Sequence, residues 1–226
     1  MELTAAAGWL NSVFFGYDSA ILGAMHSLAE GAGKFFTPLM KLITLLGEKG
    51  LLLFILAFVL MCFADTRKIG VCVFGAVCCG ALITNVILKD NIARPRPFET
   101  LEQFRIFWQF VGSPAEDGFS FPSGHVTACA AGLTALCLIW TKKMIAPAAI
   151  TTVLMGMSRN YLMAHYPSDV LFAMIIGVAS AFIAYFITKL IFKLLEDHRD
   201  NDFCRFCLEI DIRDFKKAGY KGKHCS

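Results

Sequence analysis

Length, composition and charge place this chain in a broad class before any motif is considered. It has 226 residues, of which 57% are hydrophobic and 17% are charged, and its formal net charge at pH 7 is +3. Its mean hydropathy is +0.61. Soluble domains carry about 25% charged residues, so we expect an integral membrane protein. The small net charge argues against a nucleic-acid partner, and the first residues lack the basic region of a cleavable signal peptide.

The first 48 residues are apolar but repeatedly interrupted. The stretch 10–28 contains Asp18, His26 and two glycines, and a second apolar stretch covers residues 35–46. Such interruptions are typical of a helix that lies at the membrane interface or is half-buried. We therefore predict that residues 1–48 form an N-terminal interfacial helical segment, with a sixth spanning helix as the alternative.

Five later segments predict membrane-spanning helices. They cover residues 50–64 with an upstream extension, 69–88, 123–140, 144–157 and 170–192. A helix needs about 20 residues to cross the bilayer, and fewer where its ends are packed in protein. The predicted fold is an all-α, polytopic transmembrane bundle with five to six spans. Its core is expected at residues 49–193 and a Cys-containing tail at residues 194–226.

Basic residues in the loops predict the orientation. The loops 66–68 and 141–143 share one side with the tail, and all three are rich in lysine and arginine. The positive-inside rule makes that side cytoplasmic and the opposite face extracytoplasmic, as we expect for a bacterial plasma membrane. Lys34, Lys41 and Lys49 run against this rule, because they fall on the extracytoplasmic side if five helices span.

Ionisable residues gather on that opposite face, at the ends of several predicted helices. Counting the crossings brings together the following residues: Lys89, Arg94, Arg96, His125, Arg159, His165 and Asp169. Ionisable groups that cluster near a membrane are costly and usually mark a functional site. Any one of them alone would be read as a helix anchor at the lipid headgroups.

The residue types in this cluster suit phosphoryl transfer. Lysine and arginine side chains bind phosphate oxygens, and Gly124 opens a helix whose N-terminus favours an anion. Of the two histidines, one must attack phosphorus and the other must protonate the leaving oxygen. Asp169 lies four residues after His165, a spacing that lets its carboxylate reach the imidazole. The carboxylates on this face are not spaced as a metal-ligand set.

Three motifs carry a resemblance to a known family. Lys89-x6-Arg96-Pro97 comes first, Pro122-Ser123-Gly124-His125 follows, and Ser158-Arg159-x5-His165-x3-Asp169 is third. Their order and spacing resemble the signature of the type 2 phosphatidic acid phosphatases, a superfamily that includes the vanadium haloperoxidases. The match covers Lys89 to Asp169 without a departure, and the helix order extends it to about residue 193.

The resemblance implies a role for each matched residue. His165 would be the nucleophile and form a phosphohistidine, Asp169 would orient it, and His125 would act as general acid and then as base. The phosphate oxygens would be held by Lys89, Arg96, Ser123, Gly124 and Arg159. No metal or other cofactor is implied. Arg94 lies outside the signature, and we interpret it as a headgroup contact.

The motif residues would bind the phosphate group and would not contact the group attached to it, so the motifs are compatible with several substrates. The leading hypothesis is undecaprenyl diphosphate, and the alternatives are phosphatidylglycerophosphate, phosphatidate or a soluble ester. A non-enzymatic membrane protein or a transporter is the alternative of another class, whereas a haloperoxidase would be soluble. The partners expected are the lipid substrate and the bilayer, and the oligomeric state is not readable.

The tail contains a second group of residues with metal-binding chemistry. Cys204, Cys207, His224 and Cys225 have the side chains of a zinc site, but the adjacent His-Cys pair is awkward for one ion. We favour thiols that have no special role or carry a lipid.

Overall fold

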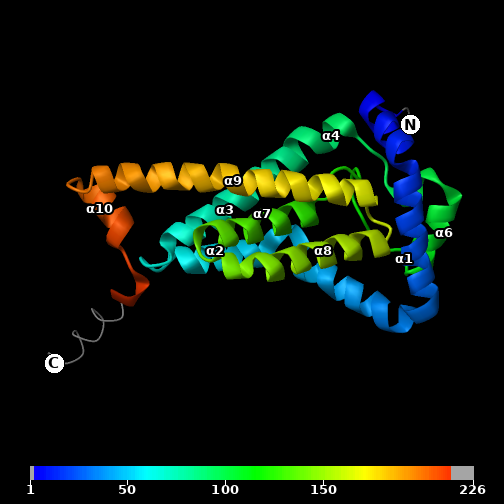
Figure 1. Ribbon diagram of the computed structural model, residues 1–226, viewed down its shortest axis with the longest axis horizontal. Coiled ribbons are helices and arrows are strands. Elements are labelled where there is room, and N and C mark those ends of the chain that lie inside the picture. The colour runs from blue at the N-terminus through cyan, green and yellow to red at the C-terminus, as the bar shows by residue number, and fades with distance from the viewer. Residues whose placement is uncertain (1–2, 215–226) are drawn as a thin grey trace.

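The structure is a computed structural model that describes residues 3–214. Its core is a lengthwise bundle of helices (Figure 1). The bundle consists of α2 (Leu51–Met61), α3 (Arg67–Ala81), α7 (Gly124–Ile139), α8 (Ile145–Tyr161) and α9 (Pro167–Asp197). Each predicted spanning segment therefore falls on a helix. Helix α9 continues to Asp197, beyond the expected end at residue 192.

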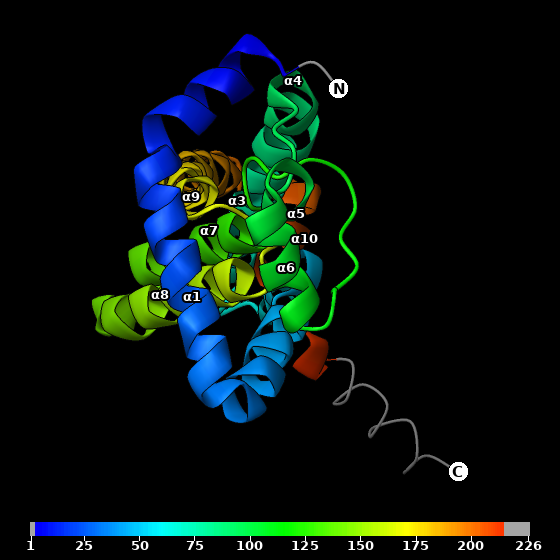
Figure 2. The ribbon, with the colours of Figure 1, turned by 90° about the vertical axis from the view of Figure 1, so that its right-hand side faces the viewer.

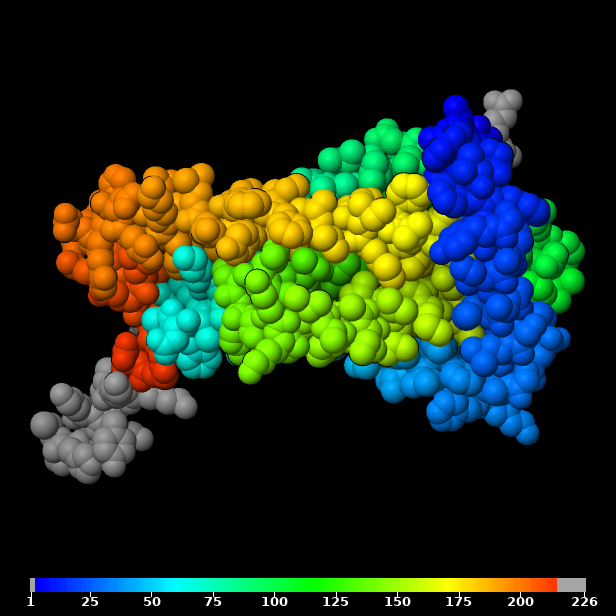
Figure 3. Space-filling model, in the orientation of Figure 1, coloured from blue at the N-terminus to red at the C-terminus, as the bar shows by residue number. Residues whose placement is uncertain are grey.

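One helix, α1 (Ala5–Leu46), replaces the two separate N-terminal stretches that we expected. It bends at Ala32, whose φ of −142° is not helical. Figures 1 and 2 show its first part lying across one end of the bundle, and Figure 3 shows it covering that end. After the bend the chain returns to the bundle and reaches α2 through η1 (Glu48–Gly50).

Short elements complete the fold and lie mainly at the two ends of the bundle. They are η2 (Leu82–Leu88), which is π-helical, α4 (Lys89–Ile92), α5 (Pro97–Thr100), α6 (Glu102–Phe110), η3 (Lys142–Met144) and α10 (Asp202–Glu209). Helices α1, α5 and α6 lie at the same end, whereas α10 lies at the opposite end (Figures 1 and 2). Helix α6 falls in a stretch where we had predicted no helix.

The outer surface of the bundle is apolar. On α9, large exposed side chains include Leu171, Ile175, Phe182, Phe186 and Leu190. Three helical stretches in the described part of the chain are long and apolar enough to cross a membrane: Ala5–Met61, Arg67–Thr100 and Pro167–Asp197. Helix α7 is apolar but shorter. Exposing such an apolar surface to water costs free energy, whereas exposing it to lipid tails does not.

Hydrogen bonds between side chains and the backbone hold the segment around α10 against one end of the bundle. Arg67 donates from Nη1 to the carbonyl of Cys207 at 2.8 Å, and the Ala64 N–H donates to Asp211 at 2.9 Å. The first part of the tail is thus docked on the loop between α2 and α3. Cys204 and Cys207 lie in α10. The other two residues of the suggested zinc set, His224 and Cys225, lie outside the described residues.

Small residues allow the bundle helices to approach closely, which is the usual packing of helices in lipid. A Cβ added at Gly177 of α9 would lie 2.6 Å from the Cβ of Ala130 and 2.7 Å from the carbonyl oxygen of Thr127, both on α7. Helix α9 therefore depends on this glycine for its contact with α7. The contact matters for function because both helices begin at the end of the bundle that α1 covers.

We expect Gly177→Ala to destabilise the protein by about 1–3 kcal/mol, because the added methyl group overpacks the α7–α9 contact. Gly23→Ala is the matched control, since a Cβ at Gly23 meets no atom within 4 Å. Thermal unfolding in detergent measures both variants. Equal melting temperatures for the two variants would contradict the packing argument.

Candidate functional site

A polar cavity of about 710 Å³ lies at the end of the bundle that α1 covers. Most of the ionisable residues that we predicted on one membrane face line this cavity. The predicted site residues that line it are Lys89, Arg96, Gly124, His125, Arg159 and His165. The two imidazoles therefore face one cavity. Asp169, Ser123 and Arg94 do not line it, and their surroundings are described below.

These residues lie at helix ends or in the loop between two helices. Lys89 follows the π-helical turn η2, and π-helical turns often occur at functional sites. His125 lies in the first turn of α7 and Arg159 in the last turn of α8. His165 belongs to the loop between α8 and α9, just after Met163, whose φ of 56° is left-handed. Such a backbone costs about 1–3 kcal/mol and persists only where the surroundings impose it.

His165 is only 2% exposed, and its tautomer follows from its contacts. Its Nδ1 lies 2.6 Å from the backbone carbonyl oxygen of Ser120. A carbonyl only accepts hydrogen bonds, so Nδ1 carries the proton and Nε2 keeps its lone pair. Burial, followed by the positive charges of Arg159 and Arg96, lowers the pKa of His165 well below its ordinary value. The imidazole is therefore neutral at neutral pH, with a free lone pair on Nε2.

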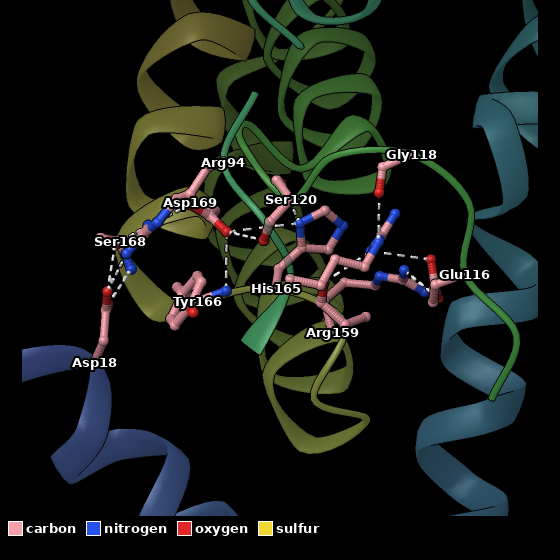
Figure 4. Close-up of polar contacts among 12 residues, drawn as sticks. Asp18, Arg94, Glu116, Gly118, Ser120, Arg159, His165, Tyr166, Ser168 and Asp169 are labelled. Carbon is pink, nitrogen blue, oxygen red and sulfur yellow. Dashed lines mark hydrogen bonds and ion pairs between the residues drawn. The ribbon is translucent and has the colours of Figure 1, made fainter. Parts of the chain in front are cut away.

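Asp169 stands behind His165 at the distance of an ion pair. Its Oδ2 lies 3.9 Å from His165 Nδ1, so the carboxylate reaches the imidazole, as the spacing predicts, but is too distant for a hydrogen bond. The carboxylate instead accepts hydrogen bonds from the Ser120 hydroxyl, the Tyr166 N–H at 2.9 Å and Arg94 Nη1 at 2.5 Å. Ser120 thus connects the two residues, because its carbonyl holds the imidazole and its hydroxyl holds the carboxylate (Figure 4).

Arg96 is fixed in place by backbone carbonyls. Its guanidinium donates to Gly118 at 3.0 Å, to Ala164 at 2.8 Å and to Asp117 at 2.7 Å. These bonds tie the loop before α7 to the loop that carries His165. Arg96 therefore supplies a positive charge to the cavity from a fixed position.

Arg159 and Ser123 keep unused polar atoms. Arg159 is 1% exposed and Ser123 is fully buried. Within residues 3–214, the Nε of Arg159 and the Oγ of Ser123 have no hydrogen-bond partner. Unpaired buried polar groups are costly, so a bound anion that accepts their hydrogen bonds would be stabilised.

Glu116 lies between the two cavity arginines. Its carboxylate is 2.5 Å from Arg159 Nη2 and 3.2 Å from Arg96 Nη1 (Figure 4). Burial alone would raise the pKa of Glu116, but the charges of Arg159 and Arg96 outweigh it and lower the pKa below its ordinary value. The carboxylate is therefore ionised. It occupies the space between the two arginines, where a bound anion would make the same contacts. No motif pointed to Glu116, since it lies in a loop without a recognisable spacing.

His125 is the more accessible of the two histidines, with a side chain 16% exposed. Its Nε2 lies 3.3 Å from Glu48 of η1. Lys41 and Lys49 also line the cavity, so two of the three lysines that ran against the positive-inside rule belong to the site. Lys41, Lys49 and Lys89 have no ion-pair partner in the described part of the chain.

Arg94 differs from the expectation of a headgroup contact. It is 1% exposed and does not line the cavity. Its guanidinium pairs with Asp169 at 2.5 Å and with Asp18 of α1 at 2.9 Å. Its guanidinium donates four hydrogen bonds to residues of α1 and α9, so Arg94 connects these two helices and is not at the lipid surface.

The fold and the site together define a helical membrane protein with a cavity lined by cationic side chains and two histidines. The sequence profile of the PAP2 superfamily matches residues 70–193, which is more than half of the chain. The chain belongs to this superfamily, and it is an integral membrane protein.

Two curated relatives and one solved structure are similar to the chain. The lipid A 1-phosphatase of Rhizobium etli is 36% identical over 135 residues, which cover 57% of this chain and 56% of that protein. The undecaprenyl-diphosphatase of Sulfolobus acidocaldarius is 29% identical over 125 residues, covering 55% and 58%. The chain thus spans just over half the length of these curated relatives.

The similar structure is a transmembrane PAP2-type phosphatidylglycerolphosphate phosphatase from Bacillus subtilis. Its TM-score is 0.62 at 24% identity, and the match covers 88% of this chain and 93% of that one. This likeness shows a shared transmembrane fold.

We expect Glu116→Gln to tighten the binding of inorganic phosphate and orthovanadate by roughly tenfold. The carboxylate competes for Arg96 and Arg159, and one charge-assisted contact is worth about 1.5–3 kcal/mol, while a tenfold change corresponds to about 1.4 kcal/mol. Calorimetric titration of the protein in detergent measures the affinity. Glu102→Gln is the control, because Glu102 is exposed and pairs only with Arg105. Weaker anion binding by Glu116→Gln would show that the carboxylate supports the site.

Proposed function

We propose that this protein is an integral membrane phosphatase that hydrolyses a lipid phosphate or diphosphate through a phosphohistidine intermediate. One observation carries the proposal above all others. A neutral, buried His165, a more accessible His125 and five cationic side chains face a single cavity. Phosphoryl transfer requires this combination of a nucleophile, a proton donor and a set of cations.

In the first step, the Nε2 lone pair of His165 attacks phosphorus. The bond between phosphorus and the leaving oxygen breaks, and His125 gives a proton to that oxygen. In the second step, His125 accepts a proton from water, the water oxygen attacks phosphorus, and the phosphorus–nitrogen bond breaks. Inorganic phosphate leaves and both histidines return to their starting states. Asp169 supports the imidazole through Ser120, which holds Nδ1–H by its carbonyl.

The transferred phosphoryl group would be held by Lys89, Arg96 and Arg159, with Ser123 and the N–H of Gly124. The unpaired Arg159 Nε and Ser123 Oγ support this assignment, because each is a buried donor without a partner among the described residues. Ser123 also precedes α7, so the N-terminus of that helix adds its partial positive charge.

The substrate that we favour is undecaprenyl diphosphate. An apolar pocket of about 320 Å³ meets the polar cavity at His125. A lipid tail in that pocket would place its bridging oxygen near the proton donor. The unpaired Lys41 and Lys49 give the cavity cationic groups beyond those that one phosphate needs. One relative carries the name undecaprenyl-diphosphatase, and the alternatives are phosphatidylglycerophosphate, phosphatidate and the lipid A 1-phosphate that another relative's name suggests.

The proposed topology follows from the fold. Residues 49–193 form the phosphatase core, in which α2, α3, α7, α8 and α9 span the membrane. Residues 1–48 form the interfacial segment, and residues 194–226 form the tail. The cavity would open on the extracytoplasmic side of a bacterial plasma membrane, with the tail in the cytoplasm. The basic loop that holds Arg67 and the loop that holds Lys142 lie at the α10 end, which supports this orientation.

A substrate panel tests the function. Purified protein in detergent should release phosphate from a polyprenyl diphosphate faster than from phosphatidylglycerophosphate, phosphatidate, lipid A or a soluble monoester. A preference for another lipid would replace the favoured substrate and keep the reaction. No release from any of them would support a transporter or a non-enzymatic protein.

We expect His165→Ala to lower turnover by at least about 10³-fold, because the nucleophile is removed. His198→Ala is the matched control, since His198 is exposed and follows α9 at the opposite end. Phosphate release under saturating substrate measures both variants. Orthovanadate should inhibit the parent protein competitively, and EDTA should leave its turnover intact. Full activity in His165→Ala would contradict the proposal that His165 is the nucleophile.

The pH dependence has a predictable sign. His165 attacks only when neutral, and its pKa lies below the ordinary value of 6.5 because of burial and the charge of Arg159. Activity is therefore retained as the pH falls to 6.5 and is lost only at lower pH. The acid limb of kcat/KM for the free enzyme measures this pKa. If the acid limb of kcat/KM had its midpoint above pH 6.5, the pKa of His165 would not be lowered as its surroundings imply.

A further inference from the structure

Arg94 is the centre of a buried network that the phosphatase motifs do not include. Its Nη1 contacts Asp169 at 2.5 Å and the Ser168 hydroxyl at 2.8 Å, both on α9. Its Nε donates to Asn11 at 2.8 Å and its Nη2 to Asp18 at 2.9 Å, both on α1. The guanidinium thus connects the helix that crosses the end of the bundle to the helix that carries Asp169 (Figure 4).

Asp18 caps the N-terminus of α9 from another helix. Its Oδ1 accepts the Ser168 N–H at 2.8 Å and its Oδ2 accepts the Ser168 hydroxyl at 2.7 Å. The first backbone N–H groups of a helix lack partners within the helix, and a carboxylate there also interacts favourably with the helix dipole. Because Asp169 follows Ser168, this cap fixes the turn of α9 that faces His165.

The charges of the network explain why two carboxylates are present. Asp18 and Asp169 each accept three hydrogen bonds, and these bonds offset part of the cost of burying a carboxylate. A single arginine beside Asp169 would cancel its charge. With both carboxylates ionised, Asp18 on the other side of Arg94 gives the three groups a net charge of −1. That negative charge stabilises the cation that forms when His165 attacks phosphorus, at a distance of 3.9 Å from Asp169.

We propose that Asp18 and Arg94 are positioning residues for His165, so that α1 forms part of the catalytic apparatus. The inference rests on the proposed function. Asp18 lies outside residues 70–193, which the family profile matches, and it does not touch the cavity. It acts through Arg94 and Asp169 and contacts no reacting atom.

Asp18→Asn tests the charge while keeping a side chain that can still cap α9. We expect kcat to fall by about 10-fold to 100-fold, the usual loss for a partner of a catalytic group. KM should change by less than about twofold, because the cavity is untouched. The acid limb of kcat/KM should also move to lower pH, because His165 loses negative charge nearby.

The pH readout is specific because this substitution leaves the groups that surround His165 in place. Those groups are Arg159 on α8, Arg96 before α5, Lys89 on α4, Glu116 in the loop before α7 and Asp169 on α9. Arg94→Lys provides the contrast, since it keeps the charge and loses the planar fork. It should lower kcat and leave the acid limb in place.

Glu30→Gln is the matched control. Glu30 is an exposed acid on the same helix, 3.5 Å from His26, and its loss should change neither kcat nor the acid limb. Thermal unfolding in detergent gives the folded fraction of every variant. A fall in activity for Asp18→Asn that only follows the folded fraction, with the acid limb unmoved, would overturn the proposal, and so would a kcat within twofold of the parent.

A substrate-free measurement separates this inference from the proposed function. The titration of His165 can be followed in ¹⁵N-histidine spectra, with His165→Gln identifying its signal. Asp18→Asn should lower the titration midpoint, and an unchanged midpoint would overturn the proposal. If the parent protein hydrolysed no lipid of the panel, the proposed function would fail while this titration still reported on the network.

Discussion

Burial of positive charge at one end of an apolar bundle is the constraint on which the structure depends. Arg94, Arg96 and Arg159 are each at most 2% exposed, and an unpaired buried charge is strongly destabilising. The three are compensated differently. Arg94 has two carboxylates, Arg96 has three backbone carbonyls and a share of Glu116, and Arg159 has Glu116 while its buried Nε has no partner among the described residues. Only Arg96 and Arg159, which face the cavity and share Glu116, can exchange that carboxylate for a bound anion.

The same end of the molecule joins polar and apolar space. The polar cavity and the apolar pocket share His125, which also lies beside Glu48 of η1. The proton donor that we propose at this boundary would suit a substrate whose phosphate is polar and whose alcohol carries a lipid tail. Helix α1 contributes to both spaces, because Lys41 lines the polar cavity and Ile43 lines the apolar pocket. The N-terminal helix is therefore continuous with the site.

The sequence allowed much of the site to be predicted because each motif lies at a helix end. Once the spans are counted, Lys89, His125 and Arg159 must emerge on one face, and the structure places all three on one cavity. The spacing of four residues predicts that Asp169 reaches His165, and the two lie 3.9 Å apart as an ion pair. The link through Ser120, which bonds to both groups, was not predicted. No spacing in the sequence indicates where a backbone carbonyl will point.

The sequence by itself determined the apolar helices, their order and the set of ionisable residues at one end, because hydrophobic length and crossing number are properties of the chain alone. Only the tertiary structure decided how those residues divide their tasks. Arg94 and Arg96 have the same side chain two positions apart, yet one is enclosed by carboxylates and the other faces the cavity. The difference arises because α1 folds back across the bundle and brings Asp18 beside Arg94. Contacts between segments so distant in sequence follow from three-dimensional packing and not from local pattern.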